Sequence, residues 1–112
     1  MSVDEGSEAM VKGEYREALA ILRPYAESGD AEAQSYLGLM YQLGLGQEPN
    51  ANEALRFLHL AVEQGRGDAA HNIGTLYLMN HPDLPRDVEK SKYWYRKARE
   101  LGFQVANDEF YL

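Results

Sequence analysis

Apolar residues in the middle of the chain recur every three or four positions, as on one face of a helix. The first such segment carries Ala33, Leu37, Met40 and Tyr41, and its spacing predicts an amphipathic helix. Residues 44–50, which include two glycines and a proline, interrupt the pattern and predict a loop. The helical spacing resumes at Ala54, Leu55, Leu58, Ala61 and Val62. The middle of the chain is therefore predicted to form a helical hairpin.

This hairpin pattern is an internal repeat. A shift of 36 positions aligns Gly38 with Gly74, and a shift of 37 aligns Phe57 with Trp94. The chain divides into repeat units at residues 1–29, 30–65 and 66–102, followed by a C-terminal segment at residues 103–112. These pieces account for all 112 residues, so we expect a single repeat domain over residues 1–112.

Local signals mark the ends of the predicted helices. Ser2 and Glu5 form an S-x-x-E capping signature, which predicts a helix that starts at residue 2 or 3. Gly29, Gly65 and Gly102 close the three units, where a helix favours a residue that tolerates positive φ. The units are therefore expected to be separated by glycine turns.

Small residues inside the predicted helices indicate that the helices pack closely. Gly38 and Gly74 lie within helical segments, where glycine costs about 1 kcal/mol relative to alanine. A two-helix hairpin cannot bury its apolar face alone, so neighbouring hairpins must stack and share one continuous core. The large aromatic residues Tyr41, Phe57 and Trp94 are expected to fill the space between hairpins rather than to stack on a ligand.

The repeat units resemble Sel-1-like repeats, relatives of the tetratricopeptide repeat with a longer loop inside each repeat. The similarity lies in residues 33–41 (AQSYLGLMY), 54–65 (ALRFLHLAVEQG) and 94–102 (WYRKARELG). It implies an all-α fold, a right-handed α-solenoid of about three helical hairpins. Because terminal repeats need a cap for solubility, residues 103–112 are expected to be a C-terminal capping segment rather than a partner-recognition segment. The resemblance also implies a protein-binding scaffold, a class whose members serve unrelated partners.

Residues that could carry enzyme chemistry are sparse. The chain has no Cys, and its three His residues, His59, His71 and His81, fall on different predicted elements. Disulfides, thiolate metal sites and a Cys nucleophile are thereby excluded, and an all-His metal site is disfavoured. The sequence also lacks the H-E-x-x-H, G-x-S-x-G and glycine-rich nucleotide-binding motifs. We therefore predict a non-enzymatic protein without catalytic, cofactor-binding or metal-binding residues.

The charge of the chain is negative and unevenly distributed. Eleven Lys and Arg stand against 18 Asp and Glu, and the three units carry −3, −4 and +2, with −2 on the final segment. Nucleic acids and anionic membranes select basic surfaces, so we expect a protein or peptide partner instead. Without an N-terminal apolar block or a membrane-length apolar stretch, the sequence predicts a cytoplasmic protein, and a monomer is favoured over an oligomer.

In the family that the chain resembles, the first helix of each repeat lines the concave surface of the array. Carried over by register, the predicted partner-binding residues are Glu32, Ser35, Leu39, Gln42, His71, Thr75 and Leu78. This mixture of polar and apolar side chains suits a peptide or helix laid across the array. The leading hypothesis is therefore an interaction module that binds a protein segment on its concave face.

Two other functions remain compatible with the sequence. The small size and acidity suit an inhibitor or immunity-type protein that neutralises an enzyme, and co-expression with a neighbouring toxic gene would test that function. The opposite charges of the first and last units suit a structural assembly adaptor that stacks end to end, and sedimentation at varied salt would test it.

Overall fold

The computed structural model describes residues 1–104, and their secondary structure is helical apart from one isolated bridge between His81 and Leu84. The helices are α1 (Val3–Val11), α2 (Tyr15–Glu27), α3 (Ala31–Leu43), α4 (Ala51–Glu63), α5 (Gly67–Leu76) and α6 (Val88–Glu100). The predicted all-α fold is confirmed. Of the predicted capping segment, residues 105–112 lie outside the described part of the chain.

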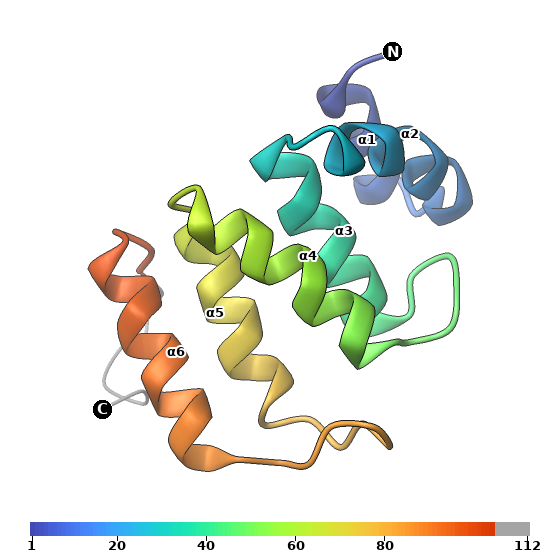
Figure 1. Ribbon diagram of the computed structural model, residues 1–112. Coiled ribbons are helices and arrows are strands. Elements are labelled where there is room, and N and C mark those ends of the chain that lie inside the picture. The colour runs from blue at the N-terminus through green and yellow to red at the C-terminus, as the bar shows by residue number, and fades with distance from the viewer. Residues whose placement is uncertain (105–112) are drawn as a thin grey trace.

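The six helices form three hairpins that stack in chain order (Figure 1). Helices α1 and α2, α3 and α4, and α5 and α6 pair within hairpins, while α2 contacts α3 and α4 contacts α5 between hairpins. We call α1, α3 and α5 the first helices, and α2, α4 and α6 the second helices. First helices of adjacent hairpins also contact each other, as α3 does with both α1 and α5.

Capping contacts mark the helix ends, including the N-terminal cap predicted at Ser2. The side chains of Ser2, Asp30, Asn50 and Asp87 each accept a hydrogen bond of 2.9–3.2 Å from the backbone N–H three residues later. Such contacts satisfy N–H groups that have no partner inside the helix. The three glycines that close the repeats, Gly29, Gly65 and Gly102, have φ of 104°, 93° and 92°. Glycine adopts this left-handed conformation without the strain that a Cβ would bring.

Close helix contacts recur at one equivalent position in every hairpin. An added Cβ at Gly6, Gly38 and Gly74 would lie 2.6, 2.6 and 2.7 Å from side-chain atoms of Leu22, Leu58 and Tyr95, respectively. Each of these glycines stands on a first helix, and each partner stands on the second helix of the same hairpin. The glycines therefore let the two helices approach to a distance that no larger residue permits. This contact also fixes which residues of the three hairpins are equivalent.

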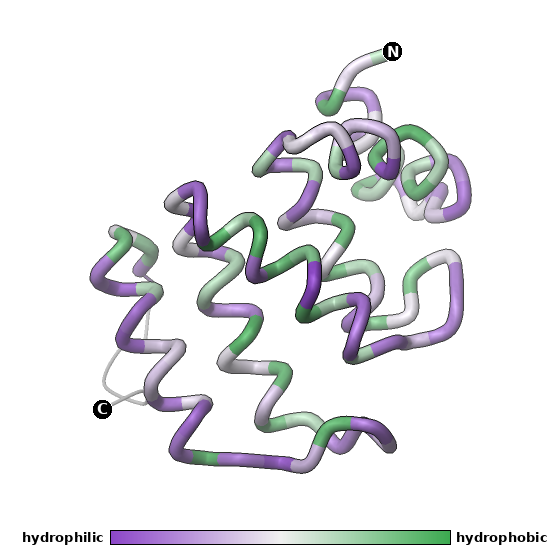
Figure 2. Tube along the Cα trace, in the orientation of Figure 1, coloured by the Kyte–Doolittle hydropathy of each residue, from purple (hydrophilic) through white to green (hydrophobic). Residues whose placement is uncertain are grey.

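The apolar core runs through the hairpins rather than gathering in one of them. Large apolar side chains with no or almost no exposed surface come from four helices: Leu22, Leu37, Met40, Phe57, Leu58, Ile73 and Leu76. Figure 2 shows apolar and polar segments alternating along the helices of every hairpin. The rings of Tyr41 and Phe57 stack with their centroids 6.1 Å apart, so these two aromatic residues pack on each other within the second hairpin.

Candidate interaction surface

Ser35 is one of the predicted partner-binding residues, and it lies between two first helices. Its side chain is 2% exposed, and its Oγ donates a hydrogen bond of 2.8 Å to Oδ2 of Asp68 on α5. Nε and Nη2 of Arg66 donate to the two carboxylate oxygens of Asp68, both at 2.9 Å. A paired, two-point contact of this kind is strong and geometrically specific. Ser35 therefore joins α3 to α5 instead of facing a partner.

These contacts lower the pKa of the Asp68 carboxyl group. Burial by itself would raise the pKa of Asp68, but the hydrogen bonds from Arg66 and Ser35 outweigh it, so the pKa lies below its ordinary value. Asp68 therefore stays ionised, and its charge is neutralised by Arg66.

Tyr36 stands beside this ion pair on the exposed side of α3. Burial raises the pKa of its phenol, and the carboxylates of Glu32 and Asp68 raise it further. The side chain is half-buried. A neutral phenol combines a hydrogen-bonding group with a flat apolar face.

Gln42 is a second predicted residue that the structure removes from the surface. It is 2% exposed, and its Nε2 lies 3.5 Å from Sδ of Met79, across the contact between the second and third hairpins. Within residues 1–104, its buried Oε1 has no hydrogen-bond partner. The prediction that Ser35 and Gln42 face a groove is corrected because both residues are buried, with contacts to Asp68 on α5 and to Met79 after α5.

His71 and Thr75 are half-buried, and both lie against the second helix of their own hairpin. The His71 ring centroid is 5.0 Å from that of Tyr95 and 5.1 Å from that of Phe103. Oγ1 of Thr75 shares a hydrogen bond of 2.9 Å with the Tyr95 hydroxyl. These two residues therefore pack against Tyr95 on α6, and His71 also packs against Phe103.

Exposed apolar residues follow one another along the first helices. On α3, residues 32, 36, 39 and 43 share one face because they are three or four positions apart. Leu39 on this face is half-buried, and Leu43 is 49% exposed. Leu78, which follows α5, is 36% exposed. We define the first-helix surface by Glu32, Tyr36, Leu39, Leu43 and Leu78.

The apolar character of this surface repeats from hairpin to hairpin. The register set by Gly6, Gly38 and Gly74 makes Val11, Leu43 and Met79 equivalent. Val11 is 85% exposed, Leu43 is 49% exposed and Met79 is half-buried. We call these three residues the apolar row and include Val11 and Met79 in the first-helix surface. Val11 is not among the partner-binding residues predicted from the sequence. The repeat register, extended to the end of the first helix, would have identified it.

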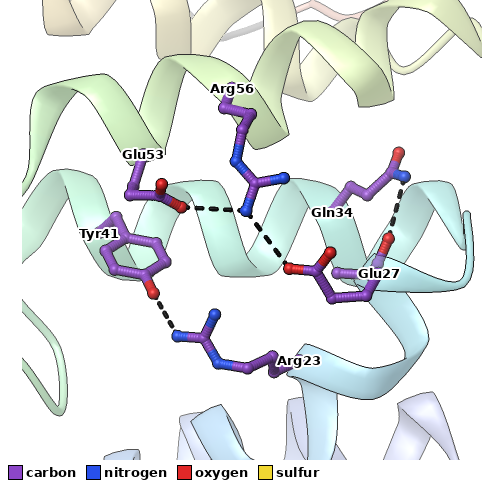
Figure 3. A network of polar contacts seen from close by, with 7 residues as sticks. Arg23, Glu27, Gln34, Tyr41, Glu53 and Arg56 are labelled. Atoms are coloured by element: carbon purple, nitrogen blue, oxygen red, sulfur yellow. Dashed lines mark hydrogen bonds and ion pairs between the residues drawn. The ribbon is translucent and has the colours of Figure 1, made fainter.

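A separate polar network joins the first and second hairpins (Figure 3). Nη2 of Arg56 on α4 lies 3.1 Å from Oε2 of Glu53 and 3.3 Å from Oε1 of Glu27 on α2. Arg23 on α2 donates to the hydroxyl of Tyr41 on α3. The contacts of Arg56 with Glu27 and of Arg23 with Tyr41 cross between the two hairpins, so the network stabilises the packing of one hairpin on the other.

Among residues 1–104, no group of three or more His, Asp or Glu side chains is arranged to hold a metal ion. In that part of the chain, no helix has the length and hydropathy needed to cross a membrane.

Comparison with known proteins identifies the repeat. The Sel1 repeat model matches residues 31–65 and 67–103. The chain belongs to the Sel1 repeat family. The first unit, residues 1–29, falls outside the two matched segments, yet Gly6 and Leu22 make the same helix contact as their equivalents in the two Sel1 repeats. Sel1 repeats generally act as protein–protein interaction modules.

Relatives share this repeat over most of the chain. A crystal structure of a Sel1 repeat protein from Oxalobacter formigenes aligns with a TM-score of 0.79 and 29% identity, covering 97% of this chain and 44% of that one. The predicted solenoid of helical hairpins is thereby confirmed.

Two curated relatives match in sequence. A putative sel1-like repeat-containing protein of Acanthamoeba polyphaga mimivirus is 30% identical over 87 residues, which are 78% of this chain and 15% of the relative. A rat protein named DAP3-binding cell death enhancer 1 is 26% identical over 102 residues, which are 89% of this chain and 19% of the relative. The Sel1 array described here thus spans less than a fifth of the length of each.

Proposed function

We propose that this Sel1 repeat protein is a non-enzymatic interaction module that binds a segment of another protein on its first-helix surface. The observation that carries the proposal is the apolar row, which presents Val11, Leu43 and Met79 at equivalent positions of three hairpins. Exposed apolar residues that are arranged together mark interaction sites more often than scattered ones do. The name of the rat relative, which states DAP3 binding, supports a protein as the kind of partner.

The two edges of the first-helix surface differ in chemistry. The apolar row lies at the C-terminal ends of the first helices, and Glu32 and Tyr36 lie toward the N-terminal end of α3. Packed helices are about 8–10 Å apart, and seven residues of an α-helix rise about 10.5 Å. A partner helix laid across the array would therefore place apolar residues seven positions apart against the apolar row. The side of the partner helix away from the apolar row would face Glu32, and a Lys or Arg of the partner is favoured there.

Affinity capture with matched variants tests this proposal. The chain is immobilised as wild type, as a Val11→Asp/Leu43→Asp variant and as a Val88→Asp/Tyr93→Asp control. All four positions are exposed, so the substitutions are expected to preserve the fold. Proteins captured from source lysate by the wild type are identified by mass spectrometry, and their affinity is then measured by titration calorimetry.

The expected result is that a captured partner loses affinity by about tenfold or more for the Val11→Asp/Leu43→Asp variant and binds the control as it binds wild type. Equal binding by all three proteins would show that the first-helix surface is not the site. Loss of binding only in the control would move the site to α6.

A further inference from the structure

The two ends of the hairpin stack carry opposite charges at positions that are apolar inside the stack. Inside, α3 presents Leu37 and Met40 to the preceding hairpin, and both are fully buried. Leu37 shares a face with Gln34 and Tyr41, both of which contact α2. Nε2 of Gln34 donates to the carbonyl of Ala26 at 3.2 Å, and Arg23 donates to Tyr41. Leu37 is thereby oriented toward the second helix of the hairpin before it.

At the N-terminal end of the stack, the same two positions are acidic. The register that matches Gly6 with Gly38 makes Glu5 and Glu8 of α1 the equivalents of Leu37 and Met40. Both carboxylates are exposed. Together with Lys12, Glu14 and Glu17 they line an open hollow of about 180 Å³. Four carboxylates and one ammonium group leave this end negative.

At the C-terminal end, the corresponding positions are basic. On α4, Leu55 and His59 face the next hairpin, where the ring of His59 contacts that of Trp94 with centroids 5.1 Å apart. The shift of 37 that matches Phe57 with Trp94 makes Lys92 and Arg96 of α6 their equivalents. Nζ of Lys92 lies 3.9 Å from Oε1 of Glu89 on the same helix, the Lys92 side chain is 43% exposed, and Arg96 is exposed. The two cations outnumber the one carboxylate. The face of α6 that a following hairpin would cover therefore carries a positive charge.

Solubility alone requires only that the terminal repeats have polar outer faces, and either sign of charge at both ends would meet that need. Equal signs would also make two copies repel each other, whereas opposite signs make them attract. The pairing of acidic α1 with basic α6 thus favours contact between copies.

We propose that the protein self-associates head to tail, with α1 of one copy seated against the α5–α6 end of a second copy. The copies meet in the register in which α3 meets α1 and α2 within the chain. Glu5 then faces α6 of the second copy, as Leu37 faces α2. Because each copy uses two different surfaces, the contact is heterologous and leaves a free end for a further copy.

Exposed charge pairs are screened by salt over about 8–10 Å at ionic strengths near 0.1–0.15 M. Association through them is therefore weak and salt-dependent, and the monomer expected from the sequence remains the main species near physiological ionic strength. At about 20 mM salt, where screening is much weaker, the weight-average mass is expected to rise with protein concentration.

A charge-swap experiment tests the proposed contact by sedimentation at low salt. One variant reverses the acidic end, Glu5→Lys/Glu8→Lys, and the other reverses the basic end, Lys92→Glu/Arg96→Glu. Each variant then has two ends of equal sign and is expected to stay monomeric, whereas an equimolar mixture of the two is expected to associate. A control, Glu48→Lys/Asp83→Lys, makes the same change in net charge as the reversal of the acidic end, but at exposed loop positions, and is expected to associate like wild type.

Three results would overturn the proposal: a wild type that stays monomeric at every concentration in low salt, association that survives either reversal, or a mixture of the variants that stays monomeric. Circular dichroism establishes that each variant is folded. If a reversal unfolds the chain, the neutral variants Glu8→Gln and Arg96→Gln take its place, each expected to weaken the association. An unchanged association constant in both neutral variants would also overturn the proposal.

Discussion

Ser35 on α3 donates a hydrogen bond of 2.8 Å to Asp68 on α5, and this bond ties the first helices of two neighbouring hairpins together. Asp68 is also held by two hydrogen bonds from Arg66. A single carboxylate thereby connects α3, α5 and the turn that precedes α5. Its removal is expected to loosen the contact between the second and third hairpins.

Replacing Asp68 by Asn is the most direct test of this connection. The substitution keeps the shape of the side chain but removes the charge that pairs with Arg66. Hydrogen bonds to charged groups contribute about 1.5–3 kcal/mol, so the free energy of unfolding is expected to fall by about 1–3 kcal/mol. Urea unfolding measures the change, and Ser35→Ala, which removes one neutral donor, is expected to cost less. A larger loss from Ser35→Ala than from Asp68→Asn would contradict this account.

The lowered pKa of Asp68 also predicts how stability depends on pH. The unfolded chain binds the proton more readily than the folded chain, so the contribution of Asp68 is fully present above its ordinary pKa of 3.8. It is lost as the pH falls through the lower pKa of the folded state. The Asp68→Asn variant is therefore expected to lose less stability than wild type on acidification below pH 3.8. Parallel acid-induced unfolding curves for the two proteins would contradict the lowered pKa.

Substitution of Gln42 is expected to raise the free energy of unfolding rather than lower it. Its Oε1 is buried and lacks a hydrogen-bond partner within residues 1–104, and leaving a buried polar atom unpaired costs about 1–3 kcal/mol. The equivalent residues in the other hairpins are Met10 and Leu78. Gln42→Met is expected to raise the free energy of unfolding by about 1 kcal/mol, measured by urea unfolding. A loss of stability would mean that this amide makes a contact that an apolar side chain cannot replace.

Gly38 tests the close approach of helices that recurs in each hairpin. A Cβ there would lie 2.6 Å from Cγ and Cδ2 of Leu58, so overpacking, which costs about 1–3 kcal/mol, opposes the gain of about 1 kcal/mol in helix propensity. Gly38→Ala is expected to destabilise the chain by up to about 2 kcal/mol. In a Leu58→Ala background, where the crowding atoms are gone, the same substitution is expected to be neutral or stabilising. Equal costs in both backgrounds would exclude crowding as the cause.

The glycine contacts show what the sequence could predict about the fold. Gly38 and Gly74 stand at the same place in two repeats, and only close packing accounts for glycine inside a helix. Helix ends such as Ser2 and Gly65 are equally local signals. The stack of hairpins followed from these residues because each hairpin makes the same contacts as its neighbour.

The candidate surface was harder to predict because repeat register gives the direction of a side chain but not what lies above it. Ser35 and Gln42 share a side of α3 with Leu39, yet the third hairpin lies close enough to bury the first two and leave Leu39 half-buried. The environment of His71 depends on Phe103, which stands where the earlier units have Asp30 and Arg66, so the repeat pattern does not predict an aromatic residue there. Such contacts depend on the distance between helices, which periodicity does not encode.

His59 provides a final prediction, on the contact between α4 and α6. Its ring meets that of Trp94 edge-on with centroids 5.1 Å apart. Burial lowers the pKa of His59 below 6.5, and the charge of Glu63 acts in the opposite direction. Below pH 6.5, His59 is therefore protonated more readily in the unfolded chain than in the folded chain. The contribution of neutral His59 to stability is present above pH 6.5 and is lost as the pH falls through the lower pKa of the folded state.

Two substitutions separate this effect from other pH-dependent terms. His59→Phe keeps an aromatic ring against Trp94 but cannot be protonated, so its unfolding free energy is expected to change less than that of wild type between about pH 7.5 and 5. Glu63→Gln removes the charge that favours protonated His59, lowers the pKa of His59 further and is expected to make the dependence steeper. Urea unfolding at both pH values measures the two slopes. Since burial and Glu63 act on the same imidazole, opposite changes in the two variants are the signature of His59. A change in the same direction in both would assign the pH dependence to another group.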